Sequence, residues 1–433
     1  MSRVSAVALA CVLLLGSAPA RAEEGAAAPQ PPLLWGGQLF GDLRVGTGEG
    51  FTEPAISRHE VRLGLTLEAK PTDRLRFFAE TWLSASGLLE GVDPGSFVEL
   101  TDPGVNGPLA LRLREAYADL YGFPFAWADL RVGRQRLAWG SAERVSVLDV
   151  LDRDDLEDRW DFGRHLASDA LRLTAYFGQH SLQAVYVPVF RPALLPAGGS
   201  FLPNLEGAAL LDPAPTVSFL VPGDDPAANA SAGLRLQLYL LGWDVALCYA
   251  LAREDFPVIT RLELAGLADL QVDLAYPRFH LAGLEVAGEL FGLGVWGELA
   301  AYFPERGNVV DLDDVDFIAV GGGQPAGQEA RPYLKAVAGM DYTFPGGLYV
   351  SLQYAYGMAY ETVAGSQEHY LLLGAEWRLL HDRLKLGPVG VALEVEDPAQ
   401  LADTWGIVLN PELSVFPADN VELAAGVRWV EGQ

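Results

Sequence analysis

The densest run of ionisable side chains lies between residues 139 and 167, where carboxylates alternate with arginines. Guanidinium and carboxylate groups form short hydrogen bonds, so this segment can pair with charges on a surface that it lies against. Carboxylates also bind Ca²⁺, but the D-x-D-x-D-G spacing of a calcium-binding loop does not occur here. We predict no metal site. The candidate residues of the segment are Asp149, Asp152, Arg153, Asp154, Asp155, Arg159 and Asp161.

No arrangement of residues indicates catalysis. The 6 histidines are scattered, and the sequence contains no H-E-x-x-H, G-x-S-x-G or P-loop motif. The nearest group of a nucleophile and a base is His165, Ser168 and Asp169, whose neighbouring positions do not place the side chains face to face. We therefore predict a protein that is not an enzyme and needs no cofactor.

The hydrophobic residues recur with a period of two, which is typical of β-strands and not of helices. In residues 60–68, for example, Val61, Leu63 and Leu65 share one face, while Glu60 and Arg62 lie on the other. The pattern predicts strands at 34–45, 57–69, 73–85, 108–120, 127–138, 168–178, 180–190, 231–241, 243–253, 279–291, 295–303, 331–344, 347–360, 368–381, 384–395, 405–415 and 419–430.

The lengths of the strands and connections favour an antiparallel transmembrane β-barrel of about 18 strands. Most predicted strands have about 10–13 residues, whereas soluble strands have about 5–6 and membrane-spanning ones about 9–11. Very short connections alternate with long ones at 86–107, 139–167, 191–230, 254–278 and 304–330. This is the pattern of outer-membrane barrels, with short periplasmic turns and long extracellular loops. A soluble β-sandwich or propeller is the alternative.

Two features of the barrel are left open by the sequence. We count 17 strands, but single-chain bacterial barrels have an even number. We expect a missed strand at 262–275, and the alternative is a final strand absent from this sequence. Aromatic residues near strand ends, among them Trp35, Trp82, Trp127 and Tyr302, suit the interfacial girdles of such barrels.

Residues 1–22 are predicted to be a secretory signal peptide. Arg3 precedes an apolar stretch from Val4 to Gly16, and Ala20-Arg21-Ala22 has the A-x-A pattern of a cleavage site. Cleavage after Ala20 and a lipidation site at Cys11 are the alternatives. Residues 23–33 then form a flexible leader, and 34–433 form a single barrel.

The composition agrees with an exported barrel and excludes other classes. The chain has 433 residues, a formal charge of −27 and 50% hydrophobic residues. It is too apolar to be disordered and too acidic to bind nucleic acid through the phosphates. An alternating barrel hides this apolar half by turning it toward lipid.

The strand pattern also places charges inside the barrel. One wall, in the first half of the chain, is mostly basic, and the opposite wall is mostly acidic, which predicts a transverse field across a water-filled pore. Simple pairing of charges across neighbouring strands is the alternative. The candidate lumen residues are Arg112, Arg114, Arg131, Gln135, Arg172, Arg235, Glu285, Glu289, Lys335 and Asp341.

One stretch resembles a known family. Gly133-Arg134-Gln135, then Trp139-Gly140, then Leu148-Asp149-Val150 is similar to a run in outer-membrane barrels of the alginate-export and DUF1302-like porin group. The match departs at Leu151-Asp152-Arg153, where the family has Asn-Pro. The weaker similarity of 278–303, 332–342 and 410–426 extends it over most of the chain, and the family pattern often continues into a further strand.

Together these features predict a porin-like channel in the outer membrane for small polar or anionic solutes. The resemblance implies a polysaccharide-related cargo. We expect the segment 139–167 to fold into the lumen and narrow it, with a solvated external loop as the alternative. A closed structural or adhesin barrel is the second functional hypothesis. The expected partners are outer-membrane lipid and small solutes, nucleic acid is excluded, and a homo-oligomer is left open.

Overall fold

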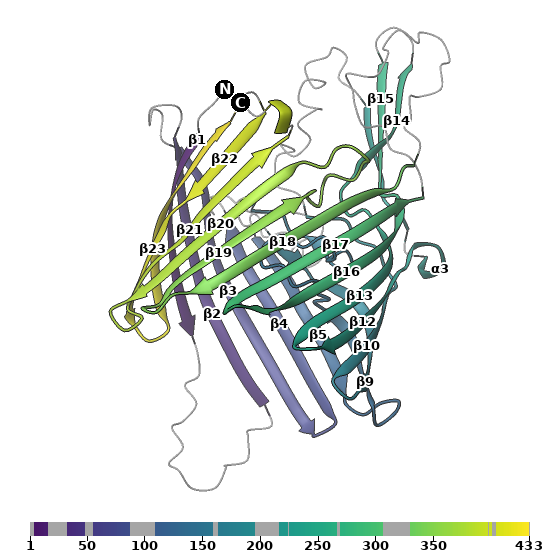
Figure 1. Ribbon diagram of the computed structural model, residues 1–433, viewed down its shortest axis with the longest axis horizontal. Helices are drawn as coiled ribbons and strands as arrows, with labels where there is room; N and C mark the ends of the chain where they lie inside the picture. The colour runs from purple at the N-terminus through teal and green to yellow at the C-terminus, as the bar shows by residue number, and fades with distance from the viewer. Residues whose placement is uncertain are drawn as a thin grey trace.

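The computed structural model describes residues 4–15, 33–47, 55–86, 109–158, 163–194, 216–223, 225–265, 269–305, 330–396, 398–400 and 404–432. One large antiparallel sheet dominates it (Figure 1). Its strands are β1 (Val4–Leu15), β2 (Leu33–Thr47), β3 (Ala55–Thr72), β4 (Leu75–Ser86), β5 (Leu109–Leu120), β6 (Ala128–Gln135), β9 (Ser168–Phe177), β10 (His180–Val187), β12 (Ser231–Leu240), β13 (Trp243–Arg253), β16 (Arg278–Leu290), β17 (Leu293–Pro304), β18 (Tyr333–Thr343), β19 (Leu348–Tyr356), β20 (His369–Leu379), β21 (Leu384–Val395), β22 (Trp405–Asn410), β23 (Glu412–Ala418) and β24 (Val421–Gly432).

Short elements lie in the connections. A two-stranded ribbon and a three-stranded sheet stand apart from the large sheet, and the three-stranded sheet projects beyond one end of it (Figure 1). The short elements are β7 (Arg153–Asp154), β8 (His165–Leu166), β11 (Thr216–Leu220), α3 (Pro226–Asn229), β14 (Val258–Ala265), β15 (Asp269–Ala275) and η3 (Pro398–Gln400).

The pairings of the large sheet form a ring. From β2 to β21 each strand of this sheet pairs with the next one in it, β22 and β23 both lie between β21 and β24, and β1 pairs with both β2 and β24. β22 and β23 are the two halves of one predicted strand, divided at Pro411, so the ring has 18 strands. The antiparallel barrel and all 17 strands predicted from the period-two pattern are confirmed.

Tight turns join several neighbouring strands. In the hairpins β12–β13 and β16–β17 the turn residues Leu241-Gly242 and Phe291-Gly292 all have positive φ, between 54° and 88°. Two consecutive residues with positive φ are typical of the type I′ turn, whose twist matches that of the strands. Glycine at the second position removes the strain that a side chain would add there.

The expected position of the eighteenth strand is wrong. The described residues of this range, 262–265 and 269–275, belong to β14 and β15, which pair with each other and, through β15, with β11 outside the ring. The eighteenth place is taken by β1, where Ala8 lies opposite Arg44 of β2 and Ala6 opposite Arg428 of β24. The strand that completes the ring therefore comes from the segment with the features of a signal peptide.

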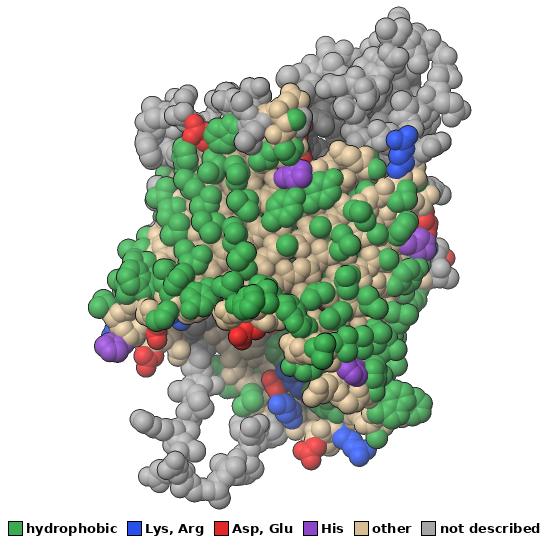
Figure 2. Space-filling view, viewed as in Figure 1, with side chains coloured by type: hydrophobic (Ala, Val, Ile, Leu, Met, Phe, Trp, Pro, Cys, Tyr) green, Lys and Arg blue, Asp and Glu red, His purple; other side chains and the backbone are tan. Residues whose placement is uncertain are grey.

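The two faces of the wall differ as the alternation requires. On β3 the side chains of Val61 and Leu65 are exposed on the outer face, whereas that of Glu60, on the inner face, is buried. Figure 2 shows apolar side chains spread over the outside of the strands, with charged groups mainly near the ends. No helix among the described residues is long and apolar enough to cross a membrane.

The inner face is less uniformly polar than the sequence pattern suggested. Ala246 and Ala250 of β13 and Leu281 of β16 face inward and are almost fully buried in a hydrophobic cluster. Two residues assigned to the aromatic girdles also face inward. Trp82 lies between the guanidinium groups of Arg62 and Arg114, each 4.2 Å from its ring, and Tyr302 is 4% exposed within the cluster.

The N-terminal processing is testable. If residues 1–22 are a signal peptide, the intact mass of the exported protein will match a chain that begins at Glu23. Cleavage would also remove β1. The two strands that flank it, β2 and β24, are both antiparallel to β1 and therefore run parallel to each other. A precursor with both Ala20 and Ala22 changed to Arg provides the uncleaved mass standard. An exported protein that retains residues 4–15 would contradict the signal peptide and assign β1 to the native barrel.

Candidate functional site

Residues 136–158 and 163–167, between β6 and β9, pack against the inside of the barrel; we call them the inner segment. β7 and β8 form a short ribbon within it. Its buried apolar side chains join one cluster with inward residues of β9, β10, β13 and β16 to β20. The inner segment therefore covers one side of the barrel interior. The buried members that it contributes are Leu137, Trp139, Val147, Leu148 and Leu151.

Two glycines of the wall receive side chains of the inner segment. A Cβ at Gly233 of β12 would lie 2.4 Å from the Trp139 ring, and a Cβ at Gly283 of β16 would lie 2.3 Å from Leu148. The indole Nε1 of Trp139 also donates a hydrogen bond of 2.8 Å to Gln183. Any larger residue at these glycines would displace the inner segment from the wall, because packed interiors leave no room for added atoms.

A single carboxylate binds one end of the inner segment. Glu298 of β17 is 4% exposed and accepts hydrogen bonds from the backbone N–H groups of Ser141 and Ala142 at 2.8 Å and of Val147 at 3.0 Å. The hydroxyl of Ser146 donates a fourth at 2.8 Å. Hydrogen bonds to an ionised acceptor are roughly twice as strong as neutral ones, so Glu298 fixes this turn of the segment.

Neighbouring strands add further contacts to the same turn. Tyr302 donates a hydrogen bond of 2.8 Å to the carbonyl of Val147, and Gln353 donates one of 3.0 Å to the carbonyl of Val145. Gly140 has a φ of +100°, and a Cβ there would lie 2.4 Å from Glu298 Oε1. Only glycine lets the chain approach the carboxylate this closely.

The opposite side of the inner segment pairs with the basic wall. Arg44 of β2 binds both oxygens of Asp158 at 2.8 and 2.6 Å. Arg112 of β5 pairs with Glu157, and Arg114 lies 3.3 Å from Asp155. The inner segment thus spans from β17 to β2 and is held by ion pairs at one side and by Glu298 at the other.

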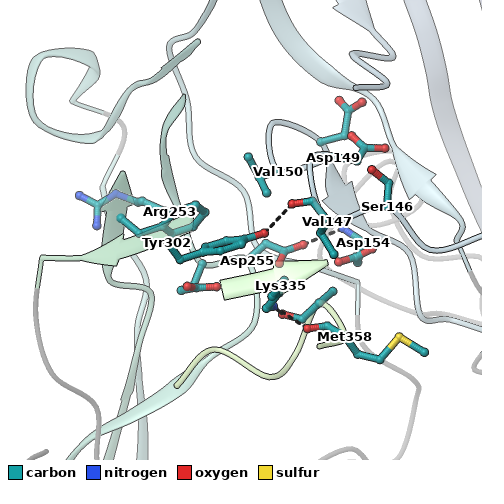
Figure 3. Close-up of a pocket in the computed structure, with 14 residues that line it drawn as sticks. Ser146, Val147, Asp149, Val150, Asp154, Arg253, Asp255, Tyr302, Lys335 and Met358 are labelled. Carbon is teal, nitrogen blue, oxygen red and sulfur yellow. Dashed lines mark hydrogen bonds between the residues drawn. The ribbon is translucent and has the colours of Figure 1, made fainter. Parts of the chain in front are cut away.

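Buried acids gather around a small cavity of about 40 Å³ where the inner segment meets the ends of β13 and β18 (Figure 3). The backbone N–H of Asp154 donates a hydrogen bond of 2.7 Å to Asp255. The ammonium group of Lys335 donates to the carbonyls of Met358 at 2.5 Å and of Ala359 at 3.3 Å. No group of acids, histidines and cysteines among the described residues has the geometry of a metal site.

Burial shifts the titration of these acids. Desolvation, followed by repulsion from Asp149, raises the pKa of Asp152 to about 7. Desolvation also raises the pKa of Glu254 to about 8. It raises the pKa of Asp154 as well, to which Asp255 adds repulsion. The inner segment therefore packs best when these carboxyl groups are protonated.

The predicted residues of the inner segment have separate partners. Arg136 pairs with Asp149 at 2.6 Å and also with Asp152, which accepts the backbone N–H of Leu137. Arg153 donates to the carbonyl of Pro192 at 3.5 Å. The predicted residues Arg159 and Asp161 lie outside the described residues.

The predicted lumen residues are mostly paired. Among the basic ones, Arg131 binds Asp119 at 2.5 Å. Arg172 lies opposite Arg131 in the register of β6 and β9. Arg235 pairs with Glu285 at 2.8 Å. Together with the ion pairs of Arg112 and Arg114, these contacts neutralise much of the basic wall. They favour pairing of charges over an open transverse field.

The other predicted lumen residues are spread over the wall. The amide of Gln135 donates to the carbonyl of Ala170 at 3.0 Å. Asp341 accepts a hydrogen bond of 3.2 Å from Tyr349. Glu289 is exposed near the end of β16. They do not converge with the inner segment on one binding site.

The sequence indicated the residues of the family-like motif between Gly133 and Val150, but not the contacts that they make. Trp139, Gly140 and Leu148 are the docking residues of the inner segment. Gly133 has a φ of +125°, and a Cβ there would lie 2.3 Å from the carbonyl oxygen of Ala116. The wall glycines Gly233 and Gly283 gave no separate signal in the sequence. Glycine at an inward position of a strand is the one feature that could have indicated a close approach.

The inner segment does not fill the barrel. A second cavity, of about 380 Å³, lies between it and the wall of β20 to β24. Its lining includes Arg144 and Val145 of the inner segment and Gly390, Asn410 and Arg428 of the wall. Unfilled space is therefore present beside the inner segment.

Comparison with known proteins gives no family. No family model matches the chain, and no curated protein matches it. Among solved structures, the chain is similar to that titled "Salmonella typhi OmpF complex with Daunomycin", with 10% identity, a TM-score of 0.43, and 99% of this chain and 97% of that one covered. It is also similar to a triple mutant of the Rhodopseudomonas blastica porin, with 8% identity, a TM-score of 0.38 and full coverage of both chains. Membership of the alginate-export group stays a prediction.

Removing the Glu298 carboxylate is expected to release the inner segment. Glu298→Ala leaves three backbone N–H groups and one hydroxyl without their acceptor, which costs on the order of 3 kcal/mol or more of docking free energy. Hydrogen–deuterium exchange of residues 136–158 should then become at least tenfold faster while the strands stay protected. Glu289→Ala, an exposed acid on the adjacent strand β16, is the control. Unchanged exchange in Glu298→Ala would refute the role of this carboxylate.

The raised pKa values of Asp152 and Glu254 predict a pH-dependent docking. A carboxyl group whose pKa is raised by folding contributes stability that is complete at low pH and is lost as the pH rises through its folded-state pKa. Exchange of residues 136–158, corrected for its intrinsic rate, should therefore accelerate between pH 6 and 8.5. Burial lowers the pKa of His165, so its contribution has the opposite sign at the lower end of this window. Asp152→Asn should flatten the pH dependence, and a steeper one would contradict it.

Proposed function

We propose that this chain is an outer-membrane channel through which small polar or anionic solutes diffuse. The observation that carries the proposal is the sorting of side chains across a closed wall. Large apolar residues such as Val61, Leu65 and Leu247 are exposed outside, while charged residues such as Glu60 and Arg44 are buried inside. With β1 in place, each strand of the ring has a hydrogen-bonded neighbour on both sides, and the interior of a membrane favours such closure because it leaves no open sheet edge.

The inner segment supports a channel that is constricted and not blocked. Its ion pairs and the Glu298 contacts hold it against part of the wall, and the cavity of about 380 Å³ beside it is left for solute. Long loops that fold inward narrow the pore in barrels of this type. An anionic polysaccharide as cargo has weaker support, because the basic wall is largely neutralised by Asp155, Glu157 and Asp158.

A second candidate function is a closed barrel whose external segments bind partners. The three-stranded sheet of β11, β15 and β14 favours it, since this sheet projects beyond the barrel (Figure 1). A sheet outside the membrane can present binding residues without any passage through the lumen. Conductance separates the two hypotheses.

Reconstituted protein in planar bilayers should give discrete conductance steps. Glu298→Ala, which frees the inner segment, should change the single-channel conductance or its noise. Asp73→Ala, which removes an exposed acid in the turn between β3 and β4, should behave as the unmodified protein. Absence of any conductance above the bilayer baseline, with the barrel shown folded by circular dichroism, would overturn the channel and favour the closed barrel.

A further inference from the structure

The cavity beside the inner segment lies where several inward positions of the wall are glycines, which have no side chain to fill the lumen. Inward positions of β20, β21 and β22 carry Gly374, Gly390 and Gly406, and Gly390 pairs with Gly374 on one side and Asn410 on the other. A Cβ at Gly390 would have only one neighbour, the Cβ of Asn410 at 3.8 Å. Unlike Gly233 and Gly283, this position receives no side chain of the inner segment, so the space stays open.

Arg144 brings a positive charge to this cavity. It lies on the inner segment, is exposed, and lines the cavity, with Nη2 3.4 Å from the position of a Cβ on Gly374. Within the part of the chain that the structure describes, no hydrogen bond or ion pair involves its guanidinium group. The adjacent Glu143 is bound instead by the Tyr349 hydroxyl.

The other ionisable groups of the cavity have partners. Glu394 accepts a hydrogen bond of 3.1 Å from Tyr370, and Glu412 lies 3.5 Å from the hydroxyl of Ser414. Arg428 donates to Asn410 at 3.4 Å. Arg144 is therefore the group of the cavity that is available to an anion from solution.

The rest of the lining is largely apolar. Leu372 of β20 is 8% exposed, and Val408 and Val430 lie opposite each other on β22 and β24. All three line the cavity together with Met358 and Val145. A solute in this space meets the guanidinium group of Arg144 next to an apolar part of the wall.

We propose that solute passes through the cavity between the inner segment and β20 to β24, and that Arg144 selects small organic carboxylates with an apolar body. The carboxylate pairs with the guanidinium group, and the apolar body lies on Leu372, Val408 and Val430. This inference rests on the proposed channel function, and it adds the path and the class of solute.

The path is tested by filling the space. Gly390→Trp places a large ring in the cavity, and Val389→Trp places the same ring on the outer face, where Val389 is 41% exposed. In planar bilayers the single-channel conductance of Gly390→Trp should fall at least about twofold, since the added ring removes pore area, while that of Val389→Trp stays unchanged. Equal conductance in both variants would place the path elsewhere in the barrel.

The selectivity is tested by changing the charge. From the reversal potential in a potassium benzoate gradient, Arg144→Ala should lower the benzoate-to-potassium permeability ratio by about fivefold, as expected for the loss of one charge near the path. Arg144→Glu should lower it further, and Arg144→Lys should largely preserve it. Chloride in place of benzoate reports the effect of charge alone. A benzoate-to-chloride permeability ratio above the ratio of their mobilities in water, retained in Arg144→Ala, supports the apolar part of the site.

The outcomes separate this inference from the channel function itself. A conducting protein whose benzoate selectivity is the same with Arg, Ala and Glu at position 144 would overturn the role of Arg144 and leave the channel intact. A benzoate-to-chloride permeability ratio equal to the ratio of their mobilities in water would overturn the apolar contact and retain an anion filter. A folded protein without conductance would overturn both proposals.

Discussion

The position of the inner segment depends on one buried carboxylate. Glu298 is almost fully enclosed, and burying a charge is costly unless it is paired or hydrogen-bonded. Its four hydrogen bonds all come from residues 141–147. One turn of the chain therefore offsets the cost of removing the Glu298 carboxylate from water. The close approach of Gly140 and the inward side chains of Trp139 and Leu148 follow from this geometry.

The acidic composition of the chain does not make the barrel interior uniformly acidic, because many of the acids are paired with arginines. Part of the acidic excess is in the inner segment, where Asp155, Glu157 and Asp158 neutralise arginines of β2 and β5. The formal charge of −27 is thus no measure of the field inside the barrel. What a solute meets is set by the few groups that lack an internal partner, and Arg144 is such a group within the described residues.

Glycine allows close packing on one side of the lumen and leaves free space on the other. Gly233 and Gly283 accept Trp139 and Leu148, so the glycines there allow the inner segment to pack closely. Gly390 faces the cavity of about 380 Å³, so glycine there widens the free space. The difference arises because the inner segment is held from β17 to β2 across one side and does not reach β21 and β22. A barrel interior is in this way divided into a packed half and an open half.

The sequence by itself determined the strands, because the alternation of side chains is a local property of extended backbone. All 17 predicted strands are found, and the inner segment was recognised from its charges and its family-like motif. The tertiary structure decided which groups meet: that Glu298 binds the turn at 141–147, that Gly233 and Gly283 accept side chains, and that β1 takes the place expected for 262–275. These contacts join residues about 90 to more than 400 positions apart, and only closure of the ring brings such residues together. A local pattern indicates which face a side chain occupies, but the partner across the lumen depends on the geometry of the whole barrel.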